Sequence, residues 1–114
     1  MTHLTHRPRR LRESDLMRDL VRETRLHVDD FIYPLFVAEG TGRVEAIQTL
    51  PGQNRYSVDT LVEEARRAVD LGIKAVLLFG IPDDDAKDDV GSCAWADDGI
   101  VQRALRALKD ADLP

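Results

Sequence analysis

The hydrophobic pattern of the chain centres on an unbroken apolar run at residues 75–79, Ala-Val-Leu-Leu-Phe. A run without alternation, ended by Gly-Ile-Pro at 80–82, is typical of a strand that is covered on both faces in a parallel sheet. Residues 58–71 repeat apolar positions at helical spacing, and Gly72 suits the left-handed position that ends a helix. The order helix, turn, strand places Phe79 at the carboxyl end of the strand, where parallel α/β proteins bind ligands.

Two elements are predicted nearer the N-terminus. Ser14 suits the N-cap of a short helix at 15–25, which has one apolar face. Residues 31–37 are rich in aromatic and β-branched side chains, so we expect the first strand there. Pro34 argues against a central place for this strand and predicts an interrupted hydrogen-bond ladder, because proline has no amide hydrogen.

A long connection at 38–56 separates the first strand from the helix at 58–71. Connections of this length inside compact domains are often functional. Ile47 and Leu50 predict that it folds back onto the body of the protein, and Ser57 is the expected N-cap of the helix.

The last predicted helix follows a polar loop at 83–96 and is capped by Asp97 or Asp98. Its expected core face consists of Ile100, Val101, Ala104, Leu105 and Leu108. The pattern thus gives two strands and two crossover helices, too little to cover a parallel pair on both faces. Either partner chains complete the sheet, or the chain is the front portion of a barrel of about 250 residues, which we favour.

Composition narrows the class of protein. The 114 residues are 43% hydrophobic and 32% charged, as in a globular domain. No apolar run approaches the ~20 residues of a membrane helix. The N-terminus lacks a secretory pattern, and the single cysteine, Cys93, gives no internal disulfide. These features favour a cytoplasmic protein without a membrane partner.

The net charge of −5 is unevenly spread. Residues 1–28 hold seven Arg and four Asp or Glu, a local charge of +3, which leaves −8 for the rest. A basic arm can bind nucleic acid or dock on a neighbouring acidic copy of the chain. Because the Arg cluster is short and has no interleaved aromatic residues, we favour self-docking over nucleic-acid binding, which remains testable as a salt-dependent shift.

Several clusters carry potential chemistry, and each has a simpler interpretation. Asp83, Asp84, Asp85, Asp88 and Asp89 offer oxygen ligands, but their spacing fits no calcium loop, so a solvated acidic loop is favoured. Cys93 has no histidine near it in the sequence and is expected to be a half-buried loop thiol. His3, His6 and His27 lie in or beside the arm and are expected to be surface groups.

The lysines and glycines give no catalytic signature. Lys87 alone lies on the ligand side of the predicted sheet, but carboxylates around it favour its ammonium form, which does not suit a Schiff-base nucleophile. Lys74 and Lys109 lie at a strand start and on an outer helix face. Gly40 and Gly42 do not make a phosphate-binding motif. Phe79 is either a core residue or the wall of a pocket.

An ordered set of motifs resembles the N-terminal third of the porphobilinogen synthase family, also called delta-aminolevulinic acid dehydratases. The motifs are Arg-Arg-Leu-Arg at 9–12, Leu-Val-Arg-Glu-Thr at 20–24, Asp-Phe-Ile-Tyr-Pro-Leu-Phe-Val at 30–37, Leu-Pro-Gly at 50–52, Leu-Phe-Gly-Ile-Pro at 78–82, Lys-Asp at 87–88, Gly-Ser at 91–92 and Gly-Ile-Val-Gln-Arg-Ala at 99–104. No single motif is decisive, but the ordered set is specific and covers nearly the whole chain.

The resemblance implies an α/β fold: an N-terminal arm (1–28) with a short helix, then the first two βα units (29–114) of a truncated TIM (β/α)8 barrel. It implies a homo-oligomer, usually an octamer, in which the arm wraps a neighbouring subunit. It also implies a hydro-lyase that condenses two 5-aminolevulinate molecules to porphobilinogen, with loss of two waters, in tetrapyrrole (haem) biosynthesis.

The family's two Schiff-base lysines, its zinc or magnesium segment and its carboxylate-binding residues belong to the part beyond Pro114. Phe79 alone maps onto a family position, as a hydrophobic wall of the substrate pocket. We therefore expect no catalytic residue, metal ligand or bound cofactor in these 114 residues and no activity from them alone. The alternative hypothesis is a non-catalytic assembly or binding module that other chains complete.

Overall fold

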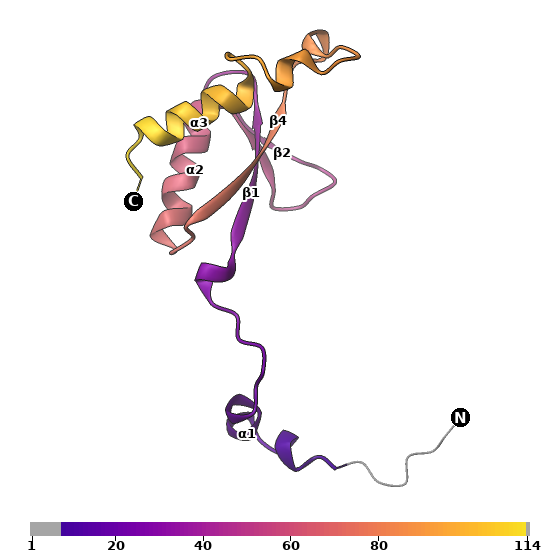
Figure 1. Ribbon diagram of the computed structural model, residues 1–114, viewed down its shortest axis with the longest axis vertical. Coiled ribbons are helices and arrows are strands. Elements are labelled where there is room, and N and C mark those ends of the chain that lie inside the picture. The colour runs from indigo at the N-terminus through magenta and orange to yellow at the C-terminus, as the bar shows by residue number, and fades with distance from the viewer. Residues whose placement is uncertain (1–7, 114) are drawn as a thin grey trace, which may run out of the picture.

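The computed structural model describes residues 8–113 of the chain (Figure 1). Its helices and strands are α1 (Asp15–Leu20), β1 (Ile32–Ala38), β2 (Val44–Ala46), β3 (Asn54–Tyr56), α2 (Val58–Asp70), β4 (Ala75–Ile81) and α3 (Ile100–Asp110). Single turns of 3-10 helix lie at Arg10–Arg12, Val28–Asp30, Asp84–Ala86 and Ser92–Ala94. None of the helices among these residues is long and apolar enough to cross a membrane.

The strands form one mixed sheet in the order β2-β3-β1-β4. β1 and β4 are parallel and stay in register from the pair Ile32–Ala75 to the pair Ala38–Ile81. β3 runs parallel to the carboxyl-terminal part of β1, at Phe36 and Val37, and β2 is antiparallel to β3. The sequence predicted β1 and β4 but not the short strands β2 and β3, which lie in the expected long connection.

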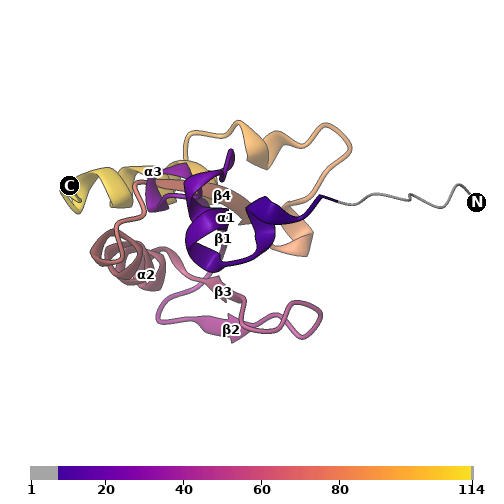
Figure 2. The same cartoon turned by 90° about the horizontal axis from the view of Figure 1, so that it is seen from below.

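Both long helices cover the same face of this sheet, as Figures 1 and 2 show from two directions. Alternate residues of β1 point toward them, because side chains alternate between the faces of a strand. The core contains Leu35, Val37, Tyr56, Leu61, Ile100 and Ala104. Leu35 and Leu61 are fully buried, and burial of such a side chain contributes roughly 1.5–3 kcal/mol.

The opposite face of β1 and β4, which we call the open face, has no covering layer among the described residues. On it lie Ile32, Pro34 and Phe36 of β1 and Leu77 and Phe79 of β4. Leu77 is 51% exposed and Phe79 45% exposed. Residues 75–79 form the expected strand, and one of its faces stays uncovered, as the count of two strands and two helices predicted, because both helices lie on the other face and β4 is the edge strand.

Pro34 also differs from the prediction. β1 lies between β3 and β4, and its register with β4 continues through the pair Pro34–Leu77 without a break. A proline is tolerated in this central strand because β3 pairs with β1 only at Phe36 and Val37. Among the described residues, Pro34 thus has a neighbouring strand on one side, β4, and its missing amide hydrogen removes no bond to β3.

The helix boundaries follow the predicted caps in part. Ser14 caps α1 by accepting a hydrogen bond from the Met17 amide at 3.2 Å, but α1 ends at Leu20 rather than Arg25. Gly72 has a φ of +88°, as expected of the residue that ends α2. The N-cap of α3 is Gly99, not Asp97 or Asp98.

The predicted apolar contacts are confirmed at some positions and wrong at others. Ile47 is buried, so the connection does fold back onto the body, whereas Leu50 is exposed. Ile100 and Ala104 of α3 are buried, and Val101 and Leu108 pack against the core at partial exposure. Leu105 was expected in the core but is 54% exposed, because none of the elements formed by residues 8–113 covers it.

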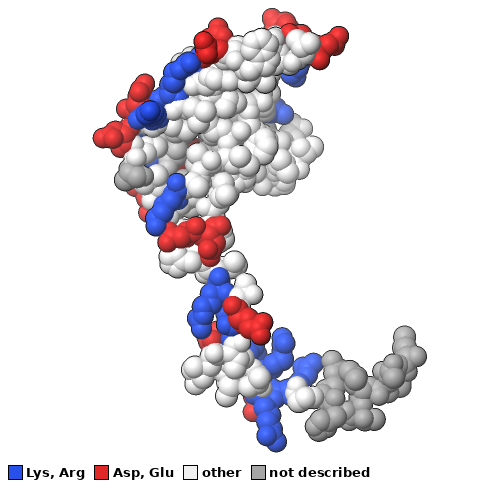
Figure 3. All heavy atoms as spheres, in the orientation of Figure 1, with Lys and Arg blue, Asp and Glu red and all other residues white. Residues whose placement is uncertain are grey.

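Residues 8–28 of the arm project away from the body, and Arg side chains gather along them in the space-filling view (Figures 1 and 3). Leu11, Leu16 and Leu20 of this segment are exposed. A helix of six residues cannot hold itself together through its own burial, so it needs a surface to pack on. The division into an arm at 1–28 and a body at 29–114 stays a prediction.

Gly80 provides a test of the packing between β4 and α3. A Cβ atom there would lie 2.5 Å from Val101 Cγ2 and 3.0 Å from Ile100 Cγ2. We predict that Gly80→Ala lowers the free energy of unfolding by about 1–3 kcal/mol through overpacking. Chemical denaturation followed by circular dichroism measures the loss. Adding Val101→Ala to Gly80→Ala should return part of it, whereas purely additive effects of the two substitutions would contradict the contact.

Because the open face exposes apolar side chains such as Leu77 and Phe79, we predict that the 114-residue chain binds an apolar fluorescent dye. Leu77→Glu should lower the dye fluorescence, because it places a charge in the middle of that face. Leu71→Glu is the matched control, since Leu71 is 74% exposed at the end of α2, away from the open face. Equal losses from both substitutions would show that the dye binds elsewhere.

Candidate functional site

The carboxyl ends of β1 and β4 bring two aromatic rings together on the open face. Phe36 and Phe79 are paired in register, and their rings stack with centroids 5.4 Å apart and planes 27° apart. Stacked aromatic pairs of this geometry are favourable beyond the area that they bury. Phe79 thus lies where the sequence placed it, at the carboxyl end of a parallel strand, and Phe36 is a neighbour that the sequence analysis did not single out.

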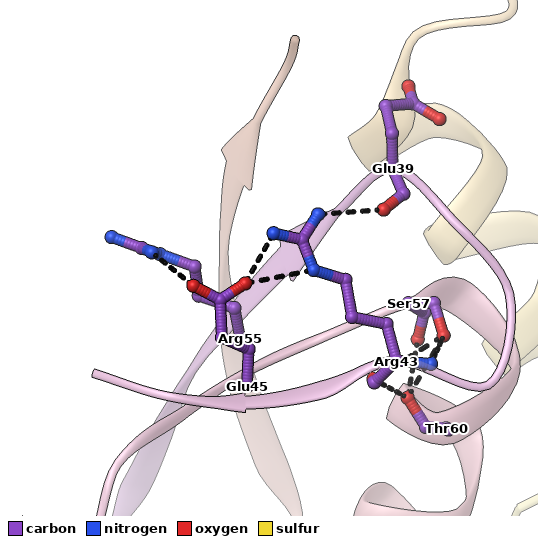
Figure 4. Close-up of polar contacts among 6 residues, drawn as sticks. All are labelled: Glu39, Arg43, Glu45, Arg55, Ser57 and Thr60. Atoms are coloured by element: carbon purple, nitrogen blue, oxygen red, sulfur yellow. Dashed lines mark hydrogen bonds and ion pairs between the residues drawn. The ribbon is translucent and has the colours of Figure 1, made fainter. Parts of the chain in front are cut away.

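A polar network joins β2 and β3 (Figure 4), and Arg55 of this network is paired in register with Phe36. Glu45 of β2 accepts hydrogen bonds from Arg43 Nε at 3.0 Å and from Arg55 Nη1 of β3 at 3.1 Å. The guanidinium of Arg43 first, and then that of Arg55, holds the pKa of the Glu45 carboxyl below its usual value. Glu45 therefore stays ionised and joins the two arginines.

Arg43 is also fixed through its main chain. Its amide donates to Ser57 Oγ at 2.8 Å, and its carbonyl accepts from the Ser57 amide at 3.0 Å and from Thr60 Oγ1 at 2.7 Å. Ser57 is the N-cap residue of α2 as predicted, but its hydroxyl bonds Arg43 and Asp59 rather than a free amide of the helix. The start of α2 thus holds the start of β2.

A second link joins the end of β1 to α3. The Glu39 carboxylate pairs with the Arg103 guanidinium, whose Nε donates to the Asp98 carbonyl at 2.9 Å. Next to this pair lies a cavity of about 330 Å³, whose lining includes Glu39, Pro82, Cys93 and Arg103.

A smaller cavity of about 150 Å³ lies between the ends of β1 and β4 and the hairpin; its lining includes Ala38, Arg43, Arg55 and Ile81. The carboxyl end of this sheet is therefore lined by two arginines and by the ends of two apolar strands.

The aspartate-rich segment is an exposed loop, as expected. Lys87 Nζ pairs with Asp84 Oδ1 at 2.6 Å, which lowers the pKa of that carboxyl. The Ser92 hydroxyl and amide hydrogen-bond to Asp88 and lower the pKa of that carboxyl too. Within residues 8–113 no three His, Cys, Asp or Glu side chains are grouped so that they could hold a metal ion. The described residues thus do not fit the zinc or magnesium that the resemblance implies, and we derive no step through it.

The remaining candidate residues do not converge on one place. Cys93 is partly buried, as expected of a loop thiol. Lys74 pairs with Asp29 at 2.6 Å at the amino end of the sheet, opposite to Phe79. His27 is exposed and caps the turn that leads into β1 through its Nδ1, which accepts from the Asp29 amide. His3 and His6 lie outside the described residues.

The sequence analysis missed the Arg43–Glu45–Arg55 network, because it treated 38–56 as a connection without strands. A signal was present in the alternation of Arg43, Val44 and Glu45, which puts both charged side chains on one face of a strand.

Comparison with known proteins identifies the family. The family model for delta-aminolevulinic acid dehydratase matches residues 5–113. The delta-aminolevulinic acid dehydratase of Methanothermobacter thermautotrophicus is 55% identical over 108 residues, which are 93% of this chain and 32% of the relative. The one from Synechococcus elongatus is 51% identical over 107 residues, which are 94% of this chain and 32% of the relative.

A solved structure agrees with the sequence comparison. The delta-aminolevulinic acid dehydratase of Toxoplasma gondii, solved with the reaction product porphobilinogen, superposes with a TM-score of 0.85 at 38% identity. The match covers 96% of this chain and 31% of that one. The expected fold class is confirmed: the chain is α/β, and its open mixed sheet matches part of that barrel structure. The chain spans about a third of the length of these relatives, and it belongs to the delta-aminolevulinic acid dehydratase family.

Proposed function

We propose that this chain is the N-terminal part of a porphobilinogen synthase, which condenses two molecules of 5-aminolevulinate to porphobilinogen with loss of two waters. The reaction belongs to tetrapyrrole biosynthesis. The observation that carries the proposal is the family match over residues 5–113. The open apolar face supports the proposal. In a (β/α)8 barrel the helices lie outside and the side chains of all eight strands fill the interior, so this face is the one that further strands would enclose.

Phe79 is the residue of this chain that we assign to the substrate pocket, as an apolar wall. Its place at the carboxyl end of β4 and its stacking on Phe36 support the assignment. A flat apolar wall excludes water and orients the carbon chain of a small substrate without taking part in proton transfer.

The Schiff-base lysines of the proposed reaction are assigned to the remaining two thirds of the enzyme. A Schiff-base lysine must lose its proton to become a nucleophile. Lys87 and Lys74 form ion pairs with Asp84 and Asp29, and Lys109 is exposed on α3.

The arm is proposed as the element that holds subunits together, with an octamer as the assembly. A hollow of about 680 Å³ on the arm is lined by arginines and apolar residues: Pro8, Arg10, Leu11, Arg12, Arg18, Val21 and Arg22. A basic, apolar surface of this kind complements the acidic body of a second copy.

The open face and the free edge of β4 support a second candidate, a non-catalytic module that separate chains complete. An apolar edge strand pairs readily with another strand. If this candidate holds, the 114-residue chain forms a defined complex with other chains without any covalent continuation.

The first test is the enzymatic assay. We predict that the 114-residue chain incubated with 5-aminolevulinate and either Zn²⁺ or Mg²⁺ yields no porphobilinogen. A full-length protein that begins with these residues should yield it, and the Methanothermobacter relative serves as the positive control. Turnover by the 114 residues alone would contradict the assignment of the lysines, and an inactive full-length protein would contradict the proposed function.

The second test concerns the arm. In the full-length protein, Arg10→Glu with Arg12→Glu should shift the assembly to smaller species in analytical ultracentrifugation, most strongly at low salt, where unlike charges attract over longer distances. Arg66→Glu with Arg67→Glu on α2 is the control of equal charge change. If the control pair shifts the assembly while the arm pair leaves it intact, the arm is not the contact.

A further inference from the structure

We propose that Arg43 is a positioning residue for the reaction: it fixes the β2–β3 hairpin at the carboxyl end of the sheet and so sets the place of Arg55 beside the Phe36–Phe79 pair. The proposal rests on the proposed function for the identity of the reaction. It goes beyond that function in assigning a role to the hairpin and to a residue that does not itself touch the rings.

The first step is the attachment of the Arg43 main chain. Both its amide and its carbonyl bond Ser57, the N-cap residue of α2. The Arg43 amide donates to Ser57 Oγ at 2.8 Å, and the Arg43 carbonyl accepts from the Ser57 amide at 3.0 Å. Ser57 is fully buried. Because buried polar groups that lose a partner are costly, this attachment resists displacement. The beginning of β2 is therefore anchored to a helix that belongs to the core.

The second step is the direction of the Arg43 side chain, seen in Figure 4. Its Nη1 donates to the Glu39 carbonyl at 3.1 Å, and its Nε donates to Glu45 at 3.0 Å. One guanidinium thus ties the end of β1 to β2. The planar guanidinium sets several donors in fixed directions, which a lysine ammonium does not.

The third step leads from Glu45 to the rings. The second oxygen of Glu45 accepts from Arg55 Nη1 at 3.1 Å. Arg55 is paired in register with Phe36, so the two side chains leave the sheet on the same face. Phe36 in turn stacks on Phe79. A shift of the hairpin therefore displaces Arg55 relative to Phe36, which stacks on Phe79, the proposed wall of the substrate pocket.

The exposure of these groups separates positioning from stability. The side chains of Arg43, Glu45 and Arg55 are each about 40% exposed, at 40%, 43% and 38%. Ion pairs at that exposure add little to stability, because water screens them. Their fixed geometry can still matter for a reaction, since a displaced pocket wall loses contacts that hold the substrate equally in the ground state and the transition state, which raises KM and leaves kcat unchanged. Loss of Arg43 should thus affect the reaction more than the fold.

The experiment compares Arg43→Met and Arg43→Lys in the full-length protein. For Arg43→Met we expect KM for 5-aminolevulinate to rise about tenfold, which is ~1.4 kcal/mol of binding, while kcat and the thermal midpoint change little. Arg43→Lys should recover only part of the KM, because it keeps the charge but not the fork of donors. Arg106→Met on α3 is the control, since the described residues give Arg106 no ion-pair partner.

Each alternative outcome overturns the proposal. Arg43 has no positioning role if Arg43→Met leaves KM unchanged, or if Arg106→Met raises KM equally. The same conclusion follows if Arg43→Met lowers the thermal midpoint and Arg43→Lys restores both the midpoint and KM. If the unsubstituted protein makes no porphobilinogen, the proposed function fails instead. In that case, amide hydrogen exchange in the 114-residue chain still tests whether Arg43 fixes the hairpin. We expect the Ile47 and Ser57 amides to exchange faster in Arg43→Met than in the unsubstituted chain. Unchanged exchange rates would overturn the positioning role of Arg43.

Discussion

The parallel pairing of β1 with β4 over seven residue pairs is the contact on which the rest of the structure depends. Parallel neighbours need a long crossover connection, and here α2 provides it. The entropy lost in closing that connection is offset by a core in which Leu35 and Val37 of β1 meet Leu61 of α2 and Ile100 of α3. Because α2 and α3 both lie on one face, the pairing also creates the open face and directs Phe36 and Phe79 onto it.

The hairpin β2–β3 extends the same sheet on its other side. It adds two short strands at the carboxyl end of β1, next to Phe36, and fixes them with ion pairs as well as through Tyr56, which lies in the core. This division of roles is common in proteins, where a packed scaffold positions polar groups on connecting segments. Here it places two arginines and two aromatic rings at one end of the sheet, and the lower half of the same edge of β1 stays without a neighbour among the described residues.

The sequence predicted the elements whose pattern is local and strong. The apolar stripe of α2, Gly72 at its end and the run at 75–79 each reflect the chemistry of a few adjacent residues, and all three appear as expected. The helix predicted to reach Arg25 ends at Leu20, and none of its residues is buried against the described part of the chain, so no packing stabilises a longer helix there. Short strands such as β2 and β3 show at most two or three alternating residues, which is a weak signal until β3 pairs with β1 and β2 pairs with β3.

The candidate site was predictable to a smaller extent. Phe79 could be placed at a strand end from the order of elements alone, whereas its partner Phe36 depends on the register between two distant strands. The network around Arg43 depends on three segments, the end of β1, the hairpin and the start of α2, which meet only in the folded chain. The elements that would cover the second face of β4 are not among the described residues, as the shortage of strands and helices in the sequence indicated.

The central claim is that the open face of β1 and β4 becomes the inside of a barrel in the full-length protein. Thiol labelling of Leu77→Cys, in a background with Cys93→Ala, measures this directly when each native rate is divided by the rate in denaturant. We predict rapid labelling in the 114-residue chain and strong protection in the full-length protein. Equal labelling rates at both lengths would contradict the account.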